Sequence, residues 1–169
     1  MTKQTHTLAM RVLDARKIPY EIHLFPDTLR DAELVAVAIG WPAAQVFKTL
    51  VVVRDDVSSA RPMLVMLPAD CALDLRGFAR TLGVKSVRMA SHDQAEKITG
   101  LKVGGISALA LLNRPFDIFI DTSALTFEQI CVSGGQRGID LGLRVADLLT
   151  VTGATPIAAS LPKQHDTTR

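Results

Sequence analysis

The segment VFKTLVVV, residues 46–53, decides the fold, because seven of its eight residues suit a protein core and the eighth is Lys48. Side chains alternate between the two faces of a strand, and here both faces are apolar, which predicts an internal strand of a sheet. A buried ammonium without a partner is costly, so the lysine needs an explanation. Two explanations stay open. Lys48 extends along the apolar surface to solvent or guards a sheet edge, or it points into a pocket for an anionic or carbonyl-bearing ligand.

The composition predicts one globular domain that lacks the strong positive charge typical of nucleic-acid-binding proteins. The chain has 169 residues, of which 48% are hydrophobic and 21% charged, and this is enough for one well-formed core. A net charge of +2 is too small to hold nucleic acid by bulk electrostatics, and 5% aromatic residues argue against a base-stacking platform. We find neither the apolar run of a signal peptide nor about 18 consecutive apolar residues, so we expect a cytoplasmic protein.

Helix and strand signals are interleaved along the chain. Apolar spacing and capping residues predict helices that start near residues 8, 32, 75, 91 and 144. Short apolar or alternating segments predict strands at YEIHLF (20–25), VFKTLVVV (46–53), PMLVML (62–67), SVRMA (86–90), SALALL (107–112), FDIFID (116–121) and EQICVSG (128–134). Because strands and helices neither alternate strictly nor separate cleanly, we predict a mixed α/β domain with a curled mixed sheet covered by helices.

Two glycine-rich loops lie next to apolar strands and offer backbone amides. The glycine pair at 104–105 leads directly into Ser107, and paired glycines let a ligand approach the backbone closely. The second loop, SGGQRG at 133–138, places a hydroxyl, exposed amides and the Arg137 guanidinium within five residues. Each loop alone is typical of an ordinary turn. Together with the buried lysine, they favour a pocket for a phosphate or a carbonyl oxygen.

The sequence contains no pattern typical of metal or nucleophilic catalysis. No His, Cys, Asp and Glu cluster has metal-ligand spacing, and neither a Ser-His-Asp nor a Cys-His arrangement can be recognised. Cys131 is flanked by apolar residues and is expected to be a packed thiol. Asp121 ends an apolar strand, where a carboxylate either serves a site or caps the next turn. An enzyme with this sequence would therefore work without a cofactor, a metal or a protein nucleophile.

Three separated motifs, VFKTLVV, ITGLKVGGIS and CVSGGQRGID, occur in the order found in the YbaK/EbsC family, and the chain resembles that family. Its members are free-standing relatives of the editing domain inserted in bacterial prolyl-tRNA synthetases. The similarity extends from the first predicted helix to about Ala159. It implies an editing domain at residues 1–160, followed by a polar C-terminal tail at 161–169. The implied fold is a small mixed α/β domain around a curled, barrel-like sheet.

The resemblance implies aminoacyl-tRNA editing, which is cleavage of the ester between a wrong amino acid and the 3′-terminal ribose of a tRNA. The members most similar to this pattern act on Cys-tRNA(Pro). Such an ester is already activated, so the domain must only hold the carbonyl, stabilise the oxyanion and orient water or a substrate group. In members that remove cysteine the substrate thiol assists, which would make the enzyme lyase-like rather than a hydrolase.

The predicted site residues fall into two groups. The catalytic group consists of Lys48, Gly104, Gly105 and Ser107. The substrate-binding group consists of Tyr20, Asp121, Ser133, Gly134, Gly135 and Arg137. The expected ligand is the 3′ acceptor end of a mischarged tRNA. Because phosphate contacts from a weakly charged protein are lost readily with salt, we expect a transient complex with prolyl-tRNA synthetase that delivers the substrate. Neither DNA nor a membrane is an expected partner.

Two residues depart from the family pattern and affect the expected substrate. Ala108 replaces the proline of the family's GGxSP loop, which would loosen the loop that sizes the amino-acid pocket. Gln136 stands where relatives often carry a cation, which weakens the expected tRNA contact. Two alternatives therefore stay open: a deacylase for alanine or serine on tRNA, and a non-catalytic module that binds a nucleotide or the tRNA 3′ end.

Overall fold

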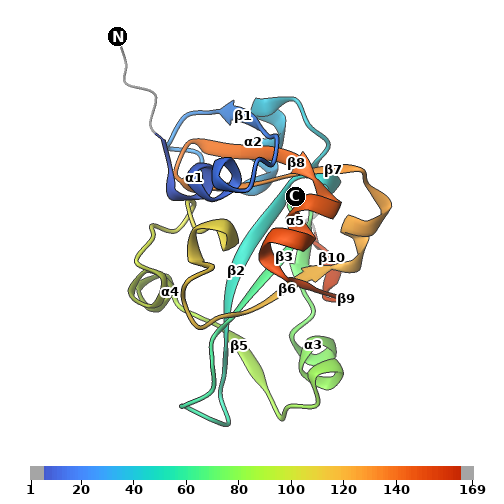
Figure 1. The fold of residues 1–169 in the computed structure, drawn as a ribbon. Coiled ribbons are helices and arrows are strands. Elements are labelled where there is room, and N and C mark those ends of the chain that lie inside the picture. Colours follow the sequence, from blue (N-terminus) through green and yellow to red (C-terminus); the bar gives the residue numbers. More distant parts are fainter. Residues whose placement is uncertain (1–5, 165–169) are drawn as a thin grey trace.

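The computed structural model describes residues 6–164, and Figure 1 shows their arrangement. The helices are α1 (Leu8–Ala15), α2 (Ala32–Ile39), α3 (Leu75–Leu82), α4 (His92–Thr99) and α5 (Val145–Thr152). The strands are β1 (Glu21–Leu24), β2 (Phe47–Arg54), β3 (Met63–Pro68), β4 (Cys71–Leu73), β5 (Val87–Met89), β6 (Asp117–Asp121), β7 (Gln129–Gln136), β8 (Ile139–Arg144), β9 (Thr155–Ile157) and β10 (Ser160–Pro162). Short 3-10 helices are η1 (Ala43–Gln45), η2 (Ala108–Leu111) and η3 (Thr122–Thr126).

The strands form three sheets. The largest has the order β5-β2-β3-β6-β9 and is mixed, because β2 pairs antiparallel with β3 and β5, whereas β6 pairs parallel with β3 and β9. A second, antiparallel sheet has the order β1-β8-β7, and β10 pairs with β4 in the third. In Figure 1 the long strands β2 and β3 connect the upper half of the molecule, which holds β1, β7 and β8, to the lower half with α3 and β5.

The predicted mixed α/β fold is confirmed, but the sheet is not closed into a barrel. Within residues 6–164, the edge strands β5 and β9 of the large sheet do not pair with each other. The β1-β8-β7 sheet meets β2 through a single bridge between Val46 and Cys131. Both edge strands are only three residues long, so neither offers a ladder that could close the sheet. The β2 strand lies between β5 and β3, as its apolar faces predicted.

Helix boundaries follow the predicted caps. Asp31 begins α2, and its carboxylate accepts a hydrogen bond from the Glu33 N–H at 2.8 Å. Gly40 ends this helix with φ of +75°, a left-handed conformation that glycine adopts without strain. Ser91 caps α4 in the same way, because its hydroxyl accepts the Gln94 N–H at 3.1 Å. These caps fix where α2 begins, and α2 forms one side of the site.

The predicted strand at 107–112 is wrong, since residues 108–111 form the 3-10 helix η2. Ala108, Leu109 and Leu111 are all buried, on more than one side of the segment. A short run that is apolar on every side has no periodicity that separates a strand from a helix. This segment packs against α1 and β7 and supports the glycine loop that precedes it.

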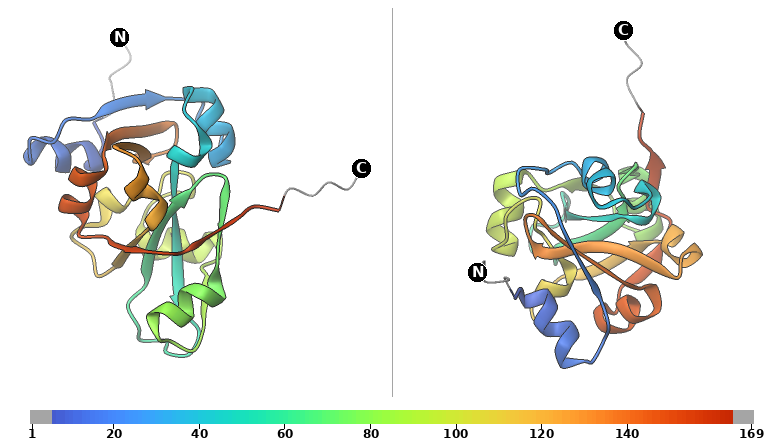
Figure 2. Two further views of the ribbon diagram at one scale, coloured as in Figure 1. Left: turned by 90° about the vertical axis from the view of Figure 1, so that its right-hand side faces the viewer. Right: turned by 90° about the horizontal axis from the view of Figure 1, so that it is seen from above.

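Three apolar clusters hold the fold together. The largest joins α1, η2 and α5 to β7, β8 and one face of β2 and β3, and a second packs α3 on the other face of β3. A small third cluster packs α2 and η1 over Val46, Ala69 and Cys131, where β2 begins. After α5 the C-terminal segment crosses the molecule (Figure 2, left). Its strands β9 and β10 pair with β6 and β4. Leu161 and Pro162, the first residues of the predicted polar tail, thus belong to β10, and residues 165–169 lie outside the described part of the chain. No helix within the described residues combines the length and the apolar character that crossing a bilayer requires.

Candidate active site

A cavity of about 180 Å³ opens beside the first half of β2. The β5 strand pairs only with residues 52–54 of β2, so within residues 6–164 the beginning of β2 has no paired strand on that side. The cavity is completed by α2 with the segment before it, by the loop at 103–106, and by β7 and β8. It is lined by Phe25, Leu29, Arg30, Ala32, Val35, Val46, Phe47, Lys48, Thr49, Leu50, Val103, Gly104, Ile106, Ser133 and Asp140. A space of this size holds a ligand about as large as benzene.

Lys48 lies in the wall of this cavity and is half-buried. Its amine donates hydrogen bonds to the carbonyl oxygens of Cys71 at 2.5 Å and Ala69 at 3.4 Å. Burial lowers the pKa of the Lys48 amine, and the nearby positive charge of Lys163 lowers it further. The bonded partners of the amine are thus carbonyl groups rather than a carboxylate. An amine in this position retains the capacity to bind an anionic or carbonyl group of a ligand.

The two glycine loops are packed directly against each other. A Cβ atom on Gly105 would lie 2.8 Å from the Arg137 backbone nitrogen and 2.9 Å from the Gln136 carbonyl carbon, so only glycine permits this approach. Gly104 has φ of +92° and lines the cavity, whereas Gly105 lies behind it. The Gly105 N–H donates to the Lys102 carbonyl at 2.8 Å. Within the described chain, the N–H groups of Gly104 and Ile106 make no such backbone hydrogen bond and remain for a ligand.

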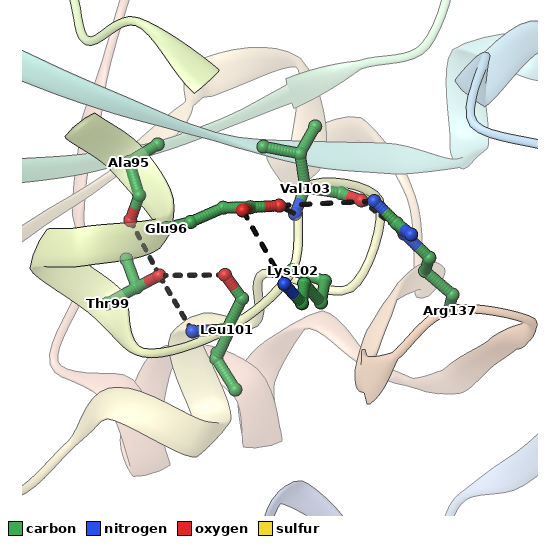
Figure 3. Close-up of polar contacts among 7 residues, drawn as sticks. All are labelled: Ala95, Glu96, Thr99, Leu101, Lys102, Val103 and Arg137. Carbon is green, nitrogen blue, oxygen red and sulfur yellow. Dashed lines mark hydrogen bonds and ion pairs between the residues drawn. The ribbon is translucent and has the colours of Figure 1, made fainter. Parts of the chain in front are cut away.

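Arg137 holds the first glycine loop in place, as Figure 3 shows. Its Nε donates to the Val103 carbonyl at 2.7 Å, and its Nη2 lies 3.9 Å from Oε1 of Glu96. The same carboxylate accepts the Val103 N–H at 3.0 Å, and this hydrogen bond is the main reason why the pKa of Glu96 is lowered. Lys102 lies 3.8 Å from the second oxygen of Glu96. The guanidinium predicted to bind substrate is therefore engaged in positioning the loop.

The second glycine loop forms a bulge in β7. The register between β7 and β8 shifts between Ser133 and Gln136, and Gly135 adopts φ of +89° within that shift. The Ser133 hydroxyl accepts the Gly135 N–H at 3.2 Å, which orients it at the cavity wall. Gly134 lies close to Ile139, where a Cβ would approach its side chain to 2.8 Å. Ser133 therefore faces the cavity, while Gly134 and Gly135 shape the turn behind it.

Like Gly105, Gly134, Gly135 and Arg137, three further predicted site residues do not line the cavity. Ser107 is buried, and its hydroxyl has no hydrogen-bond partner among residues 6–164. The Tyr20 hydroxyl donates to Asp14 at 3.0 Å. The buried Asp121 carboxylate accepts the N–H groups of Ala159 at 2.9 Å and Ser123 at 3.1 Å, the latter as the cap of η3.

Sequence reasoning missed two polar residues that line the cavity. Asp140 on β8 is buried, and burial alone raises the pKa of its carboxyl to about 7. Within the described residues no hydrogen bond or ion pair engages this carboxyl, although it faces the cavity. Thr49, one residue after Lys48, also lines the cavity, but its hydroxyl is buried away from solvent without a hydrogen-bond partner in the described chain. Unsatisfied buried polar groups are expensive, and a polar ligand in the cavity would satisfy the Asp140 carboxyl.

The fold and the cavity define a small mixed α/β domain in which a lysine and a glycine loop face one pocket. A sequence profile described as the aminoacyl-tRNA editing domain matches residues 27–151. The chain belongs to this family, and the resemblance inferred from its three motifs is confirmed.

Two similar proteins support this assignment. EbsC of Enterococcus faecalis, named as a proposed Cys-tRNA(Pro)/Cys-tRNA(Cys) deacylase, is 31% identical over 151 residues, which cover 88% of this chain and 90% of EbsC. A proline–tRNA ligase of Shouchella clausii is 32% identical over 103 residues, which cover 61% of this chain and 17% of the ligase.

Two solved structures share the fold at 22% sequence identity. The crystal structure of a proposed trans-editing enzyme for prolyl-tRNA synthetase has a TM-score of 0.79 and covers 95% of this chain and 99% of that one. The crystal structure of the hypothetical protein APE2540 has a TM-score of 0.82 and covers 92% of this chain and 100% of that one. At this identity the two structures support the fold alone.

Proposed function

We propose that this protein is a trans-editing deacylase that cleaves the aminoacyl ester of a mischarged tRNA, with Cys-tRNA(Pro) as its substrate. The family assignment and the similarity to EbsC support this function. The observation that carries it is the composition of the cavity wall. One small space is lined by Lys48, Gly104, Ser133 and Asp140.

These groups match the parts of an aminoacyl-adenosine. The ionised Asp140 carboxylate would receive the α-ammonium group, which is the cationic part of the substrate. The free N–H groups of Gly104 and Ile106 would donate to the ester carbonyl as it becomes an oxyanion. Such a donor contributes about 10²–10³ in rate. Lys48 would hold the negatively charged end of the terminal nucleotide, and Ser133 would help to position the same end of the substrate.

The reaction needs no protein nucleophile, because the attacking group comes from water or from the substrate. In hydrolysis, water adds to the ester carbonyl, the C–O bond to the ribose breaks, and the ribose oxygen takes the proton. In the cysteine-specific route, the thiol sulfur forms the new bond to the carbonyl carbon, the C–O bond to the ribose breaks, the ribose oxygen takes the thiol proton, and a thiolactone leaves. The protein's task in both routes is to orient the reactants and stabilise the oxyanion.

The small pocket supports a small amino acid as the group removed. Ala108, which replaces the family proline, is buried at the start of η2 and does not line the cavity. The loss of proline therefore acts on the support of the glycine loop rather than on the pocket surface. This supports cysteine as the substrate, with alanine and serine as the alternatives to be measured.

Delivery by prolyl-tRNA synthetase completes the proposal. The matching segment of a proline–tRNA ligase indicates that an editing module of this kind also occurs within a synthetase chain. A free-standing domain with a net charge of +2 has few phosphate contacts of its own to select a tRNA. We expect purified synthetase to raise the rate or the selectivity of deacylation, and an unchanged rate and selectivity would contradict the transient complex.

A deacylation assay with cysteine, alanine and serine, each charged on tRNA(Pro), tests the proposal. We expect the fastest release of cysteine, and analysis of the released product separates free cysteine from its thiolactone. Correctly charged prolyl-tRNA(Pro) is the control substrate and should remain intact. Binding of these tRNAs without release of any amino acid would overturn the deacylase function in favour of a non-catalytic module.

A further inference from the structure

The two edges of β2 differ in how much of their backbone is paired. Backbone groups of alternate residues in a strand point to opposite edges. The Val46 carbonyl accepts the Ala69 N–H at 2.7 Å, so even-numbered residues point toward β3 and the residue after it. The Val51 carbonyl accepts the Ala90 N–H at 3.0 Å, so odd-numbered residues point toward the side of β5. The N–H and C=O groups of residues 47 and 49 therefore point to the β5 side of β2.

No strand of the described chain pairs with this edge at residues 47 and 49. The β5 strand pairs with residues 52–54, beside the lower end of β2 in Figure 1. Its register would place residue 92 opposite residue 49, but the chain begins α4 there. The β7 strand reaches the edge at the bridge between Val46 and Cys131 and then enters its bulge. Because Phe47 and Thr49 both line the cavity, the place of a paired strand is open to a ligand.

The Phe47 carbonyl and the Thr49 N–H are an acceptor and a donor that lie side by side on this edge. In a parallel sheet, the C=O of one residue and the N–H two residues later bond to both backbone groups of one neighbouring residue. Within residues 6–164 neither group takes part in a turn, loop or cap hydrogen bond. The cavity wall around them is largely apolar, with Leu50, Val103 and Ile106 nearby. Since a polar group without a partner is costly in such surroundings, the edge favours a ligand group that both donates and accepts.

The amino-acid side chain is the part of the proposed substrate that still lacks a polar partner. The α-ammonium group, the ester carbonyl and the charged end of the nucleotide are assigned to Asp140, to the glycine loop and to Lys48. A cavity of about 180 Å³ has room for a small side chain. A thiol or a hydroxyl is both a donor and an acceptor, whereas a methyl group is neither. The open edge therefore suits the side chains of cysteine and serine better than that of alanine.

We propose that the Phe47 carbonyl and the Thr49 N–H recognise the side chain of the esterified amino acid and select a thiol or a hydroxyl over an alkyl group of similar size. The S–H or O–H group donates to the carbonyl, and its sulfur or oxygen accepts the N–H. This inference rests on the proposed function, because it concerns the amino acid that the ester carries. Selection by hydrogen bonding, rather than by size alone, makes the open edge of β2 a determinant of substrate specificity.

Binding of stable substrate analogues tests this recognition without catalysis. The probes are 3′-amino-3′-deoxyadenosines that carry the amino acid through an amide in place of the ester. The cysteinyl probe is compared with the 2-aminobutyryl probe, in which a methyl group replaces the thiol, and the seryl probe is compared with the alanyl probe. By calorimetry, wild-type protein is expected to bind the cysteinyl and seryl probes at least about five-fold more tightly than their alkyl counterparts.

Removal of one backbone N–H locates the recognition. Replacing Thr49 by its α-hydroxy acid exchanges this N–H for an ester oxygen and should reduce each preference to less than about two-fold. The same exchange at Ser58, in the exposed turn between β2 and β3, is the matched control and should keep both preferences. Thr49→Val removes the hydroxyl, retains the N–H and should keep both preferences as well. Melting temperatures establish that each protein is folded.

Three outcomes of these binding measurements would overturn the proposal. The first is wild-type protein that shows no preference in either pair of probes, or in only one of them. The second is a folded ester variant at Thr49 that keeps the full preference, which would exclude the backbone N–H. The third is loss of the preference in a folded Thr49→Val variant, which would assign the recognition to the hydroxyl.

Deacylation kinetics then connect the strand edge to the reaction and separate its role from the proposed function. For wild-type protein, kcat/KM on Cys-tRNA(Pro) should exceed that on 2-aminobutyryl-tRNA(Pro) at least about five-fold, and the ester variant at Thr49 should lose much of this ratio. Equal kcat/KM values for the two substrates in wild-type protein would contradict the proposal. If wild-type protein cleaves neither ester, the proposed function fails, and the probe measurements still decide whether the edge of β2 recognises the side chain.

Discussion

Replacing Asp140 with asparagine should make the protein more stable and less active. The carboxyl is buried in the cavity wall, and burial raises its pKa to about 7 from an ordinary value of 3.8. Asparagine has nearly the same shape and cannot ionise, so it resembles the protonated acid that the folded protein prefers. The substitution therefore removes the cost of a buried carboxylate, together with the group proposed to bind the α-ammonium.

The pH dependence of this effect follows from the two pKa values. Below about pH 4 Asp140 is protonated in both the folded and the unfolded chain, so wild type and Asp140→Asn should be equally stable. Between about pH 4 and pH 7 the unfolded chain loses this proton first, and the contribution of Asp140 to stability falls as the pH rises. Above about pH 7 the difference is constant. The difference between the pKa of 3.8 in the unfolded chain and about 7 in the folded protein corresponds to about 4 kcal/mol in favour of the variant.

Urea unfolding of both proteins between about pH 4 and pH 9 measures this difference directly. Asp117→Asn is the matched control, since Asp117 is exposed at the start of β6 and its replacement should change stability by less than about 0.5 kcal/mol at every pH. The reasoning is refuted if Asp140→Asn is no more stable than wild type at pH 8, or if the difference does not change with pH.

The same variant tests the proposed contact with the α-ammonium. At pH 8 we expect kcat/KM to fall about ten-fold or more on aminoacyl-tRNA, which is the loss of a charge-assisted hydrogen bond. The matched substrate is the corresponding hydroxyacyl-tRNA, in which the α-amino group is replaced by a hydroxyl. Wild type should prefer the aminoacyl form, and the variant should not discriminate. A variant that keeps the wild-type preference would rule out this role for Asp140.

Two further substitutions and one thiol-labelling reaction test the packing around the site. Gly105→Ala should destabilise the protein by about 1–3 kcal/mol, because its Cβ would lie 2.8 Å from a backbone atom of Arg137; urea unfolding at the wild-type level would contradict this close packing. Arg137→Met should lower kcat about ten-fold with little change in KM, because it releases the glycine loop; a pure KM effect would instead indicate direct substrate binding. Cys131 should resist a thiol reagent that labels Cys71 in the folded protein, because burial raises the pKa of the Cys131 thiol strongly and hides its sulfur; equal labelling rates would be inconsistent with the described core.

The sequence predicted the central strand and its lysine because their signal is local. Residues 46–53 are apolar on both faces, and an ammonium among them stands out without knowledge of any neighbour. The caps of α2 and α4 were predicted for the same reason, since Asp31 and Ser91 bond to amides two or three residues away. Patterns of this kind require only the geometry of a helix or a strand.

Asp140 was missed because its surroundings come from distant parts of the chain. The alternation of Ile139, Asp140 and Leu141 is typical of an antiparallel strand with one face in water. In the structure that face is covered instead, as Trp41 packs against the neighbouring Gly142. A single sequence does not show that residue 41 meets residue 142, so the buried carboxylate looked like a solvated one.

The role predicted for Arg137, substrate binding, differs from its role in the structure for a similar reason. Its position in a glycine loop suggested a free guanidinium, but its hydrogen-bond acceptor is the carbonyl of Val103, 34 residues earlier. The two loops were predicted to serve one pocket, and the structure adds that Gly105 packs on the backbone of the other loop. The Arg137 guanidinium supports the first glycine loop through its hydrogen bond to Val103, and no motif within either loop indicates this role.

The direct test of the central claim is single-turnover deacylation of Cys-tRNA(Pro) by Lys48→Met and Lys48→Arg beside the wild-type protein. With both variants shown to be folded by their melting temperatures, we predict that methionine lowers the rate at least about 100-fold at subsaturating protein and that arginine restores part of it. A folded Lys48→Met variant that releases cysteine at the wild-type rate would contradict the assignment of this cavity as the place where the ester is held and cleaved.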